Sequence, residues 1–364
     1  MPAPTPRPGV DRIKAHMLGA GPSGERPPAI LLHSNESVYG ASPHALAATR
    51  AAVTGIERYL EMPDRLMTPA IAECHGLDAA CITVGHGSDD LLARAARAFL
   101  SPGDELIRSA NGYLKVPNYA YANDAEAVSV PDNDFVPSVD RMIASLTERT
   151  RIVYLANPEN PAGTYLSRAE IRRLHAALPE DVLLILDCAY EEYVTAEDYE
   201  PGNTLAAEAG NVIVTRTFSK IYGLAGARVG WVYGSPNIID AVRRVGVTFP
   251  LATPSAAAVL AALEDRGHVA MVRRENQQER EALAARLSAI GLHVVPSQTN
   301  FLLVRFSDPS RSAAAVHDHL RARGILVRRF ASPAYADCIR ITLGFPHENA
   351  ACADGIGAFL NGGA

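Results

Sequence analysis

Lys220 lies in the segment whose residue types are best suited to chemistry. It follows Ser219, and Arg228 lies eight positions further along, beyond the Gly-rich run Gly223–Gly226. A lysine amine can form a Schiff base with a carbonyl compound. Ser219 and Arg228 suit a phosphate, because the planar guanidinium donates two parallel hydrogen bonds and keeps its charge. The segment therefore indicates a covalently bound aldehyde cofactor that carries a phosphate.

Three further polar residues follow strand-like runs in the middle of the chain. Asp187 closes the apolar run Val182–Leu186, Tyr190 lies three positions later, and Asn160 follows a run that ends at Ala156. Ligands of parallel α/β sheets bind beyond the carboxyl ends of the strands. There Asp187 could keep a pyridine nitrogen protonated, and the other two could reach a phenolic oxygen of the ring. Asp187 could equally be a capping aspartate, and Tyr190 an ordinary half-buried tyrosine.

A turn of small and polar residues, Gly85–Asp90, joins a strand-like run to a helix-like one. At Gly87, Ser88 and Asp89, backbone N–H groups and the positive end of the helix favour an anion. Ser88 or Asp89 could equally be a plain helix cap. Tyr113 follows the next strand, where its ring could stack on a flat cofactor or simply pack in the core.

The bulk composition describes an ordinary globular protein and excludes several classes. The chain has 364 residues, is 48% hydrophobic and 20% charged, and carries a net charge of −6. Its charges are interspersed, which argues against nucleic acid as a partner, and no apolar run approaches the roughly 18 residues of a membrane span. The five cysteines form no CxxC pair, and without metal-ligand spacing we expect no metal. We expect a cytoplasmic protein, since the Pro-rich start lacks the apolar core of a signal peptide.

The elements that must position these residues alternate between strand-like and helix-like segments. Strands are predicted over 80–84, 105–108, 151–156, 182–187 and 211–215, and helices over 89–100 and 167–177. Strands that are apolar throughout and alternate with helices are typical of a mostly parallel sheet covered on both faces. A long helical segment to about residue 290 comes next, and then strands over 300–306, 325–330 and 339–343 and a helix over 312–323. These later segments predict a smaller α+β domain, which the N-terminal arm joins.

Several motifs in this chain resemble those of the fold-type I pyridoxal-phosphate aminotransferases. Asn157–Gly163 resembles their Asn-Pro-x-Asn-Pro-x-Gly motif, Asp187–Tyr190 their Asp-x-Ala-Tyr motif, and the Lys220 segment their Schiff-base signature. Several motifs in the same order are far more specific than one. Within class I/II, the resemblance is greatest to the histidinol-phosphate aminotransferase branch, at Ser34–Glu36 with Tyr39-Gly40, Arg58-Tyr59, Gly87–Asp89, Asn300-Phe301 and Arg340–Thr342.

This resemblance implies a fold and a role for each candidate residue. The implied fold is α/β: an arm (1–40) that joins the small domain, a large pyridoxal-phosphate-binding domain (41–245) with a mostly parallel seven-stranded sheet flanked by helices, and a small C-terminal α+β domain (246–364). The implied catalytic residues are Lys220, as the Schiff-base lysine, Asp187 at the ring nitrogen and Tyr190. The other implied cofactor contacts are Asn160 at the ring oxygen, Tyr113 on the ring, and Ser219, Arg228, Gly87, Ser88 and Asp89 at the phosphate. A homodimer is implied as well, with active sites at the subunit interface, because Tyr59 would reach the phosphate of the neighbouring subunit.

The implied reaction moves an amino group from an amino acid or amino-alcohol phosphate to a 2-oxo acid such as 2-oxoglutarate. Histidinol phosphate or an aromatic amino acid would be the donor, and Arg340, Arg328 and Asn35 would bind the substrate. One alternative is a pyridoxal-phosphate-dependent decarboxylase of the threonine-phosphate type on the same scaffold. Another is a non-catalytic module that only binds the cofactor.

The chain departs from the family pattern at several positions. Glu159 and Ala162 replace the common Asn and Thr of the proline motif, and Cys188 replaces the usual Glu after Asp187. Lys115 and Val116 follow Tyr113 where Met and Tyr are common. None of these changes alters the cofactor set, and we expect most to lie near the substrate, so the donor need not be histidinol phosphate.

Overall fold

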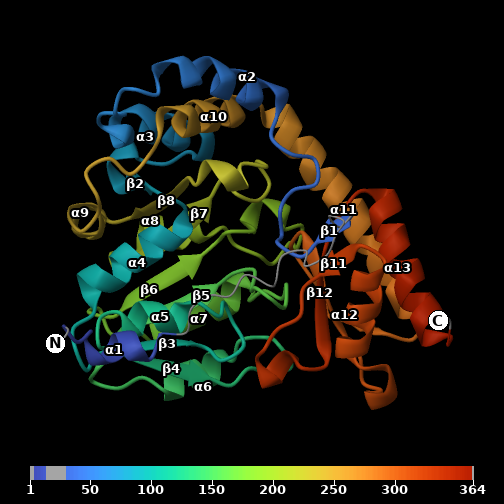
Figure 1. The fold of residues 1–364 in the computed structure, drawn as a ribbon. Helices are drawn as coiled ribbons and strands as arrows, with labels where there is room; N and C mark the ends of the chain where they lie inside the picture. The colour runs from blue at the N-terminus through green and yellow to red at the C-terminus, as the bar shows by residue number, and fades with distance from the viewer. Residues whose placement is uncertain (1–3, 14–29, 363–364) are drawn as a thin grey trace.

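The computed structural model describes residues 4–13 and 30–362 (Figure 1). Its largest sheet has seven strands, in the order β2-β8-β7-β6-β5-β3-β4. The strands are β2 (Ile82–Gly85), β3 (Glu105–Ser109), β4 (Glu126–Val130), β5 (Thr150–Ala156), β6 (Leu183–Asp187), β7 (Val212–Thr217) and β8 (Gly230–Gly234). β8 runs antiparallel to β2 and β7, and the other pairings are parallel. The predicted mostly parallel seven-stranded sheet is confirmed.

This sheet is buried on both faces. In β6, Leu184 and Leu186 belong to one hydrophobic core, whereas Leu183 and Ile185 belong to another. Successive side chains of a strand point to opposite faces, so a strand covered on both sides needs a continuous apolar run. The large-sheet helices are α2 (Pro43–Ala52), α3 (Pro63–His75), α4 (Ser88–Phe99), α5 (Val116–Tyr121), α6 (Val139–Ala144), α7 (Arg168–Ala176), α8 (Gly202–Glu208), α9 (Pro236–Arg244) and α10 (Thr253–Glu264). Residues of α4, α5 and α9 enter one core, and residues of α6, α7 and α8 enter the other.

A second group of elements lies beside the large sheet (Figure 1). It contains the antiparallel sheet β12-β10-β9 and a parallel pair, β1 with β11. The strands are β1 (Ile30–Leu32), β9 (His293–Val294), β10 (Phe301–Arg305), β11 (Ile325–Val327) and β12 (Cys338–Thr342), and the helices are α11 (Arg266–Ala289), α12 (Ala313–Ala322) and α13 (Pro346–Leu360). These strands and helices share a separate hydrophobic core, which includes Leu302, Ile341 and Ile356. The domain boundaries 41–245 and 246–364 remain a proposal: α10 belongs to the core of the large sheet, and after α10 the second core begins only at Leu283.

The described parts of the N-terminal arm lie in two different places. β1 pairs with β11, but α1 (Pro8–Asp11) lies near the edge strand β4 of the large sheet. There the Gly9 N–H donates to Asp124 Oδ1 at 2.8 Å, and Arg12 forms an ion pair with Glu126 at 2.6 Å. We expected the whole arm to join the smaller domain; residues 1–3 and 14–29 lie outside the described residues.

Some predicted elements differ in detail. The predicted strand over 80–84 begins with a 3-10 turn, Ala79–Cys81, and no strand was predicted at the positions of β4 and β8. The long helix predicted up to residue 290 is divided at Asp265 into α10 and α11, because the Asp265 carboxylate accepts the His268 N–H at 3.1 Å and caps a new helix. Among the described helices, none has both the length and the apolar character needed to cross a membrane.

Candidate functional site

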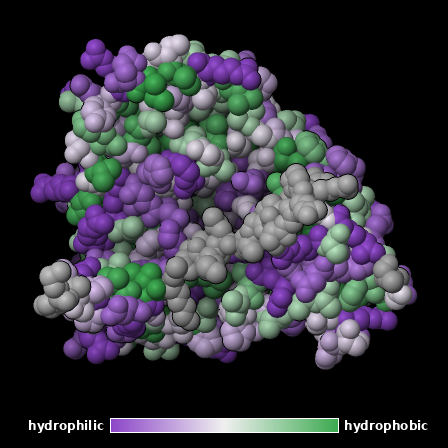
Figure 2. Space-filling model, in the orientation of Figure 1, coloured by the Kyte–Doolittle hydropathy of each residue, from purple (hydrophilic) through white to green (hydrophobic). Residues whose placement is uncertain are grey.

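A cavity of about 560 Å³ lies at the carboxyl ends of β5, β6 and β7. Twelve of the fourteen predicted site residues line it: Asn35, Ser88, Asp89, Tyr113, Asn160, Asp187, Tyr190, Ser219, Lys220, Arg228, Arg328 and Arg340. Its size is that of a small-molecule site. In the space-filling view, a hollow bordered by hydrophilic residues is visible near the middle of the molecule (Figure 2).

Asp187 forms the buried inner end of the cavity and is 6% exposed. Its carboxylate accepts hydrogen bonds from the Tyr154 hydroxyl at 2.8 Å and from Thr215 Oγ1 at 3.1 Å. Burial raises the pKa of Asp187 to about 6, although these two donors lower it. Tyr154 and Thr215 were not predicted, because they come from the strands on either side of β6 and only the strand order reveals them.

Lys220 follows β7, and its Nζ reaches into the same cavity. The Nζ lies 3.5 Å from the Ser34 carbonyl oxygen and 5.7 Å from the centre of the Tyr190 ring. The Tyr190 hydroxyl accepts a hydrogen bond from Asn35 Nδ2 at 2.9 Å. Asn35 is held in turn by Thr342, whose Oγ1 donates to Asn35 Oδ1 at 3.0 Å. A segment before α2 and a strand of the second sheet therefore position the residues that face Lys220.

The groups predicted for a phosphate converge at the N-terminus of α4. Arg228 Nη1 donates to Ser219 Oγ at 3.3 Å and to the Ala225 carbonyl at 3.0 Å. Gly87 has a φ of +82°, and a Cβ on it would lie 2.5 Å from Arg228 Nη2. A guanidinium, a hydroxyl and the amides of a helix start together suit a phosphate dianion. The cradle fits such a group because Gly87 carries no side chain.

Asp89 organises one wall of this phosphate end. Its carboxylate accepts hydrogen bonds from the hydroxyls of Tyr113 at 2.9 Å and Tyr119 at 2.7 Å, and from Lys115 Nζ at 2.9 Å. Burial alone would raise the pKa of Asp89, but these donors outweigh it and lower the pKa. Because the side chain is engaged in this way, Asp89 would offer an anion its backbone N–H.

Arg340 and Arg328 supply the positive charge at the other end of the cavity. Arg340 Nη1 donates to Asn160 Oδ1 at 2.6 Å and Nη2 to the His33 carbonyl at 2.8 Å, while its Nε has no partner among the described residues. Burial lowers the pKa of Arg340 to about 10 and also lowers that of Arg328. The two arginines are bridged through their backbones. Two close guanidiniums repel each other, so an anion between them is favoured.

The structure leaves two predicted residues outside the cavity lining. Gly87 lies directly behind it, against Arg228. Tyr59 is 75% exposed and stacks on Phe249, with ring centres 4.3 Å apart. Tyr59 of this chain therefore does not contribute to its own cavity.

Two departures from the family pattern contact predicted cofactor residues. Lys115, one of only three lysines in the chain, bonds to Asp89. Glu159 Oε1 accepts the backbone N–H of Asn160 at 3.1 Å. Sequence reasoning assigned no role to either residue, and the spacing of Lys115 from Asp89 gave no signal of the contact.

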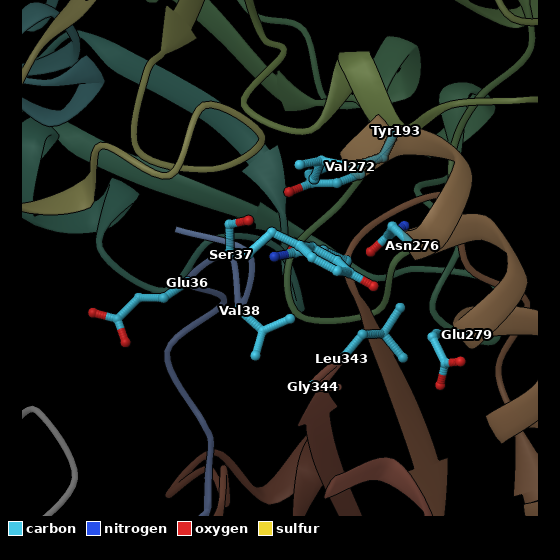
Figure 3. A pocket seen from close by; sticks show the side chains of 11 residues that line it. Glu36, Ser37, Val38, Tyr193, Val272, Asn276, Glu279, Leu343 and Gly344 are labelled. Carbon is cyan, nitrogen blue, oxygen red and sulfur yellow. The ribbon is translucent and has the colours of Figure 1, made fainter. Parts of the chain in front are cut away.

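A second hollow lies beside the first, lined by residues that include Ser37, Val38, Tyr193, Val272 and Asn276 (Figure 3). Its volume of about 10 Å³ is roughly that of one water molecule, so it cannot hold a substrate. The Glu36 carboxylate points away from it (Figure 3). Among the described residues, no group of His, Cys, Asp and Glu side chains is arranged to hold a metal ion.

Comparisons with known proteins agree on one family. Residues 27–354 match the family described as aminotransferase class I and II. The chain is 42% identical to histidinol-phosphate aminotransferase of Rhodospirillum centenum over 100% of both chains, and 40% identical to that of Nitrobacter winogradskyi over 99% of both. The crystal structure of histidinol-phosphate aminotransferase from Sinorhizobium meliloti in complex with pyridoxal-5'-phosphate is similar as well. It is 29% identical, with a TM-score of 0.91 over 98% of both chains.

Proposed function

This chain belongs to the class I and II aminotransferases, and on that premise we propose that it transfers the amino group of histidinol phosphate to 2-oxoglutarate with pyridoxal phosphate as cofactor. The observation that carries the proposal is that Lys220, Asp187 and Arg228 converge on one cavity. Each suits a different part of the cofactor: the aldehyde, the ring nitrogen and the phosphate. We also propose a cytoplasmic location.

The residues present fit the cofactor at both ends. Arg228, Ser219 and the start of α4 would hold the phosphate, and Asp187 would keep the ring nitrogen protonated. Tyr113 would lie against the ring, with its hydroxyl anchored on Asp89. Asn160 and Tyr190 would contact the ring oxygen. When bound, the cofactor supplies an electron sink for the carbon from which a proton is removed.

In the proposed reaction Lys220 is the general base and general acid. Its Nζ lies at the cavity wall, 3.5 Å from the Ser34 carbonyl, and it would take the proton from the carbon that bears the amino group. The same Nζ would then return the proton to a carbon of the cofactor. Tyr190, beneath Lys220, would orient the ring and help to exclude water.

The two arginines favour a doubly charged donor. Arg340 and Arg328 place two guanidiniums at one end of the cavity, where a phosphate monoester or a dicarboxylic acid would be bound. Histidinol phosphate and 2-oxoglutarate both have such a group, so one anion site would serve both halves of the reaction. An aromatic amino acid has a single carboxylate and would make fewer charged hydrogen bonds to the two arginines.

The decarboxylase alternative would require a donor carboxylate held where carbon dioxide can leave. The relatives named above are all aminotransferases, which favours amino-group transfer. A module without catalysis is disfavoured because Lys220 lines the cavity beside Asp187.

A panel of amino donors tests the proposal directly. We expect histidinol phosphate to give a higher kcat/KM with 2-oxoglutarate than aromatic amino acids or threonine phosphate, measured as glutamate formed. Release of carbon dioxide without glutamate would instead establish the decarboxylase.

A homodimer belongs to the same proposal. Ile56, Tyr59, Met62 and Val247 are large apolar side chains that are each more than half exposed, and Phe249 stacks on Tyr59. Hydrophobic residues are visible at the top of the molecule, around α2 (Figure 2). An exposed apolar patch of this kind marks an interaction surface. A second copy would cover the patch and bring its Tyr59 to the phosphate end of this cavity.

A further inference from the structure

Glu159 is a buried carboxyl that the proposed reaction does not use. It precedes Asn160, which lines the cavity, and is itself 1% exposed. Its backbone is fixed on both sides, since the Glu159 N–H donates to the Thr164 carbonyl at 2.7 Å and its carbonyl accepts the Gly163 N–H at 2.8 Å. The side chain lies against Gly112, where an added Cβ would be 2.9 Å from Glu159 Oε1.

The contacts of this carboxyl are incomplete for a charged group. Oε1 accepts the Asn160 N–H at 3.1 Å, and Oε2 has no partner among the described residues. The buried Arg108 donates from its two Nη atoms to the Gly112 carbonyl at 2.9 Å and the Ser129 hydroxyl at 3.5 Å, and its Nε has no partner among the described residues. A charged oxygen buried without a donor costs far more free energy than a neutral one.

The surrounding charges also favour the neutral form. Burial is the largest influence and raises the pKa of Glu159 to about 8; Asp132, beyond β4, and Asp187, on β6, act in the same direction. Arg108, on β3, and the Asn160 N–H oppose them. Tyr154 and Tyr335 also face this carboxyl, and both hydroxyls stay neutral because burial raises their pKa values.

Asn160 connects this carboxyl to the substrate end of the cavity. Its backbone N–H is held by Glu159, and its Oδ1 accepts a hydrogen bond from Arg340 Nη1 at 2.6 Å. Any shift of the Asn160 backbone would move both the amide that faces the cavity and the arginine that it orients.

We propose that Glu159 is a positioning residue which, as a neutral acid, holds Asn160 in place for Arg340 and the cofactor, and which loosens anion binding when it ionises at alkaline pH. The ionised carboxylate would add a third negative charge next to Asp132 and Asp187, beneath a site that binds anions. The part of this inference that concerns substrate binding rests on the proposed function. The protonation of Glu159 does not.

The sign of the pH effect on stability follows from the direction of the shift. In the unfolded chain the carboxyl has its ordinary pKa of 4.5. Between that value and about 8, the folded chain keeps a proton that the unfolded chain has lost. The contribution of Glu159 to the free energy of unfolding therefore falls as the pH rises through this window.

Infrared spectroscopy of the intact holoenzyme tests the protonation. We expect a protonated-carboxyl C=O band near neutral pH that is absent from Glu159→Gln and fades in the wild type with a midpoint of about 8. In the holoenzyme Asp187 would be an ionised carboxylate beside the protonated ring nitrogen, so it would give no protonated-carboxyl band near neutral pH. If the Gln variant does not fold, the wild-type titration alone decides, and a spectrum without a band that fades near 8 overturns the inference.

Urea unfolding and steady-state kinetics test the positioning role. Between about pH 7 and about pH 9.5, we expect the KM for 2-oxoglutarate to rise about tenfold more in the wild type than in Glu159→Gln. The kcat should change with pH in the same way in both proteins. The Gln variant should also lack the fall in unfolding free energy between pH 4.5 and about 8.

Glu105→Gln is the matched control. Glu105 is also buried, but the hydrogen bonds from Thr147 and Arg149 outweigh its burial and lower its pKa. Its variant should keep the KM profile of the wild type. KM profiles of wild type and Glu159→Gln that superimpose would overturn the positioning role even where the infrared band is present. A protein with the band but no transaminase activity would refute the proposed function instead.

Discussion

At the scale of single residues, the site separates into groups that carry charge and groups that hold them. Lys220, Arg228 and Arg340 are the cations that would meet aldehyde, phosphate and substrate, and each is held by a carbonyl or hydroxyl oxygen rather than by a carboxylate. A cation that is not paired with an acid remains available to an anionic ligand. The acids of the cavity are engaged separately: Asp187 with Tyr154, and Asp89 with Lys115.

Replacing Lys220 by alanine tests the covalent role. We expect Lys220→Ala to lose the visible absorbance of the lysine-bound cofactor and to lower kcat by about 10² to 10⁴-fold, the usual contribution of a general base. Lys115→Ala, which removes the other lysine of the cavity, should keep the absorbance. A Lys220→Ala protein with the wild-type spectrum would exclude the role.

Replacing Arg340 by lysine tests the anion site. Lysine keeps the charge but has one nitrogen in place of the planar fork, whose Nη1 and Nη2 separately reach Asn160 and the His33 carbonyl. We expect the KM for 2-oxoglutarate to rise roughly 10- to 100-fold, as for the loss of a hydrogen bond between charged groups. Arg329→Lys, at the exposed neighbouring position, is the control and should leave KM unchanged.

At the scale of elements, the phosphate end depends on how closely α4 approaches the loop that follows β7. A Cβ on Gly230 would lie 2.5 Å from the Ser88 backbone nitrogen, so β8 touches the first residue of α4 directly. β8 runs antiparallel within an otherwise parallel sheet and brings Arg228, just before it, back to the helix start. The amides of α4 and the guanidinium thus share one position in space.

Gly87→Ala tests this contact between elements. The new methyl group would displace Arg228. The backbone of Gly87, with φ of 82° and ψ of 167°, lies in a region that is essentially restricted to glycine, so alanine there would cost about 1–3 kcal/mol of stability. We expect the Kd for pyridoxal phosphate, measured by absorbance titration, to rise about tenfold. Gly103→Ala also has a positive φ, of +87°, but meets nothing within 4 Å, so it should lose stability and keep the affinity.

At the scale of the whole molecule, the cavity is built from parts far apart in the sequence. The large sheet supplies Asp187 and Lys220, whereas the second group of elements supplies Arg328 and Arg340. The substrate end can therefore form only when both parts are in place. The exposed patch around Tyr59 lies outside this cavity and would be completed by a second copy.

Charges placed in the patch test the dimer. We expect the double variant Ile56→Asp, Val247→Asp to sediment as a monomer, because each position is 67% exposed and an interface would bury both. Ile290→Asp, at an exposed position after α11, should sediment like the wild type. A wild-type protein that is monomeric at micromolar concentration would contradict the proposal.

Local sequence patterns reveal where the functional groups occur along the chain and which strands precede them. Apolar runs closed by a polar residue, as at Asp187, are local patterns, and so are the proline motif and the Lys220 segment. These patterns led to the parallel sheet and to the set of site residues, twelve of which line one cavity. Local periodicity could do this because side-chain direction in a strand or helix repeats over a few residues.

The partners of those groups, by contrast, depend on how the strands and helices pack together. Tyr154 lies 33 positions from Asp187, and Arg340 lies 180 positions from Asn160, so their hydrogen bonds depend on strand order and on how the two parts of the fold meet. The same holds for Lys115 on Asp89 and for the burial of Glu159, to which sequence reasoning gave no function. Burial and charge environment are properties of the packed molecule, and they set whether a carboxyl such as Glu159 carries a proton.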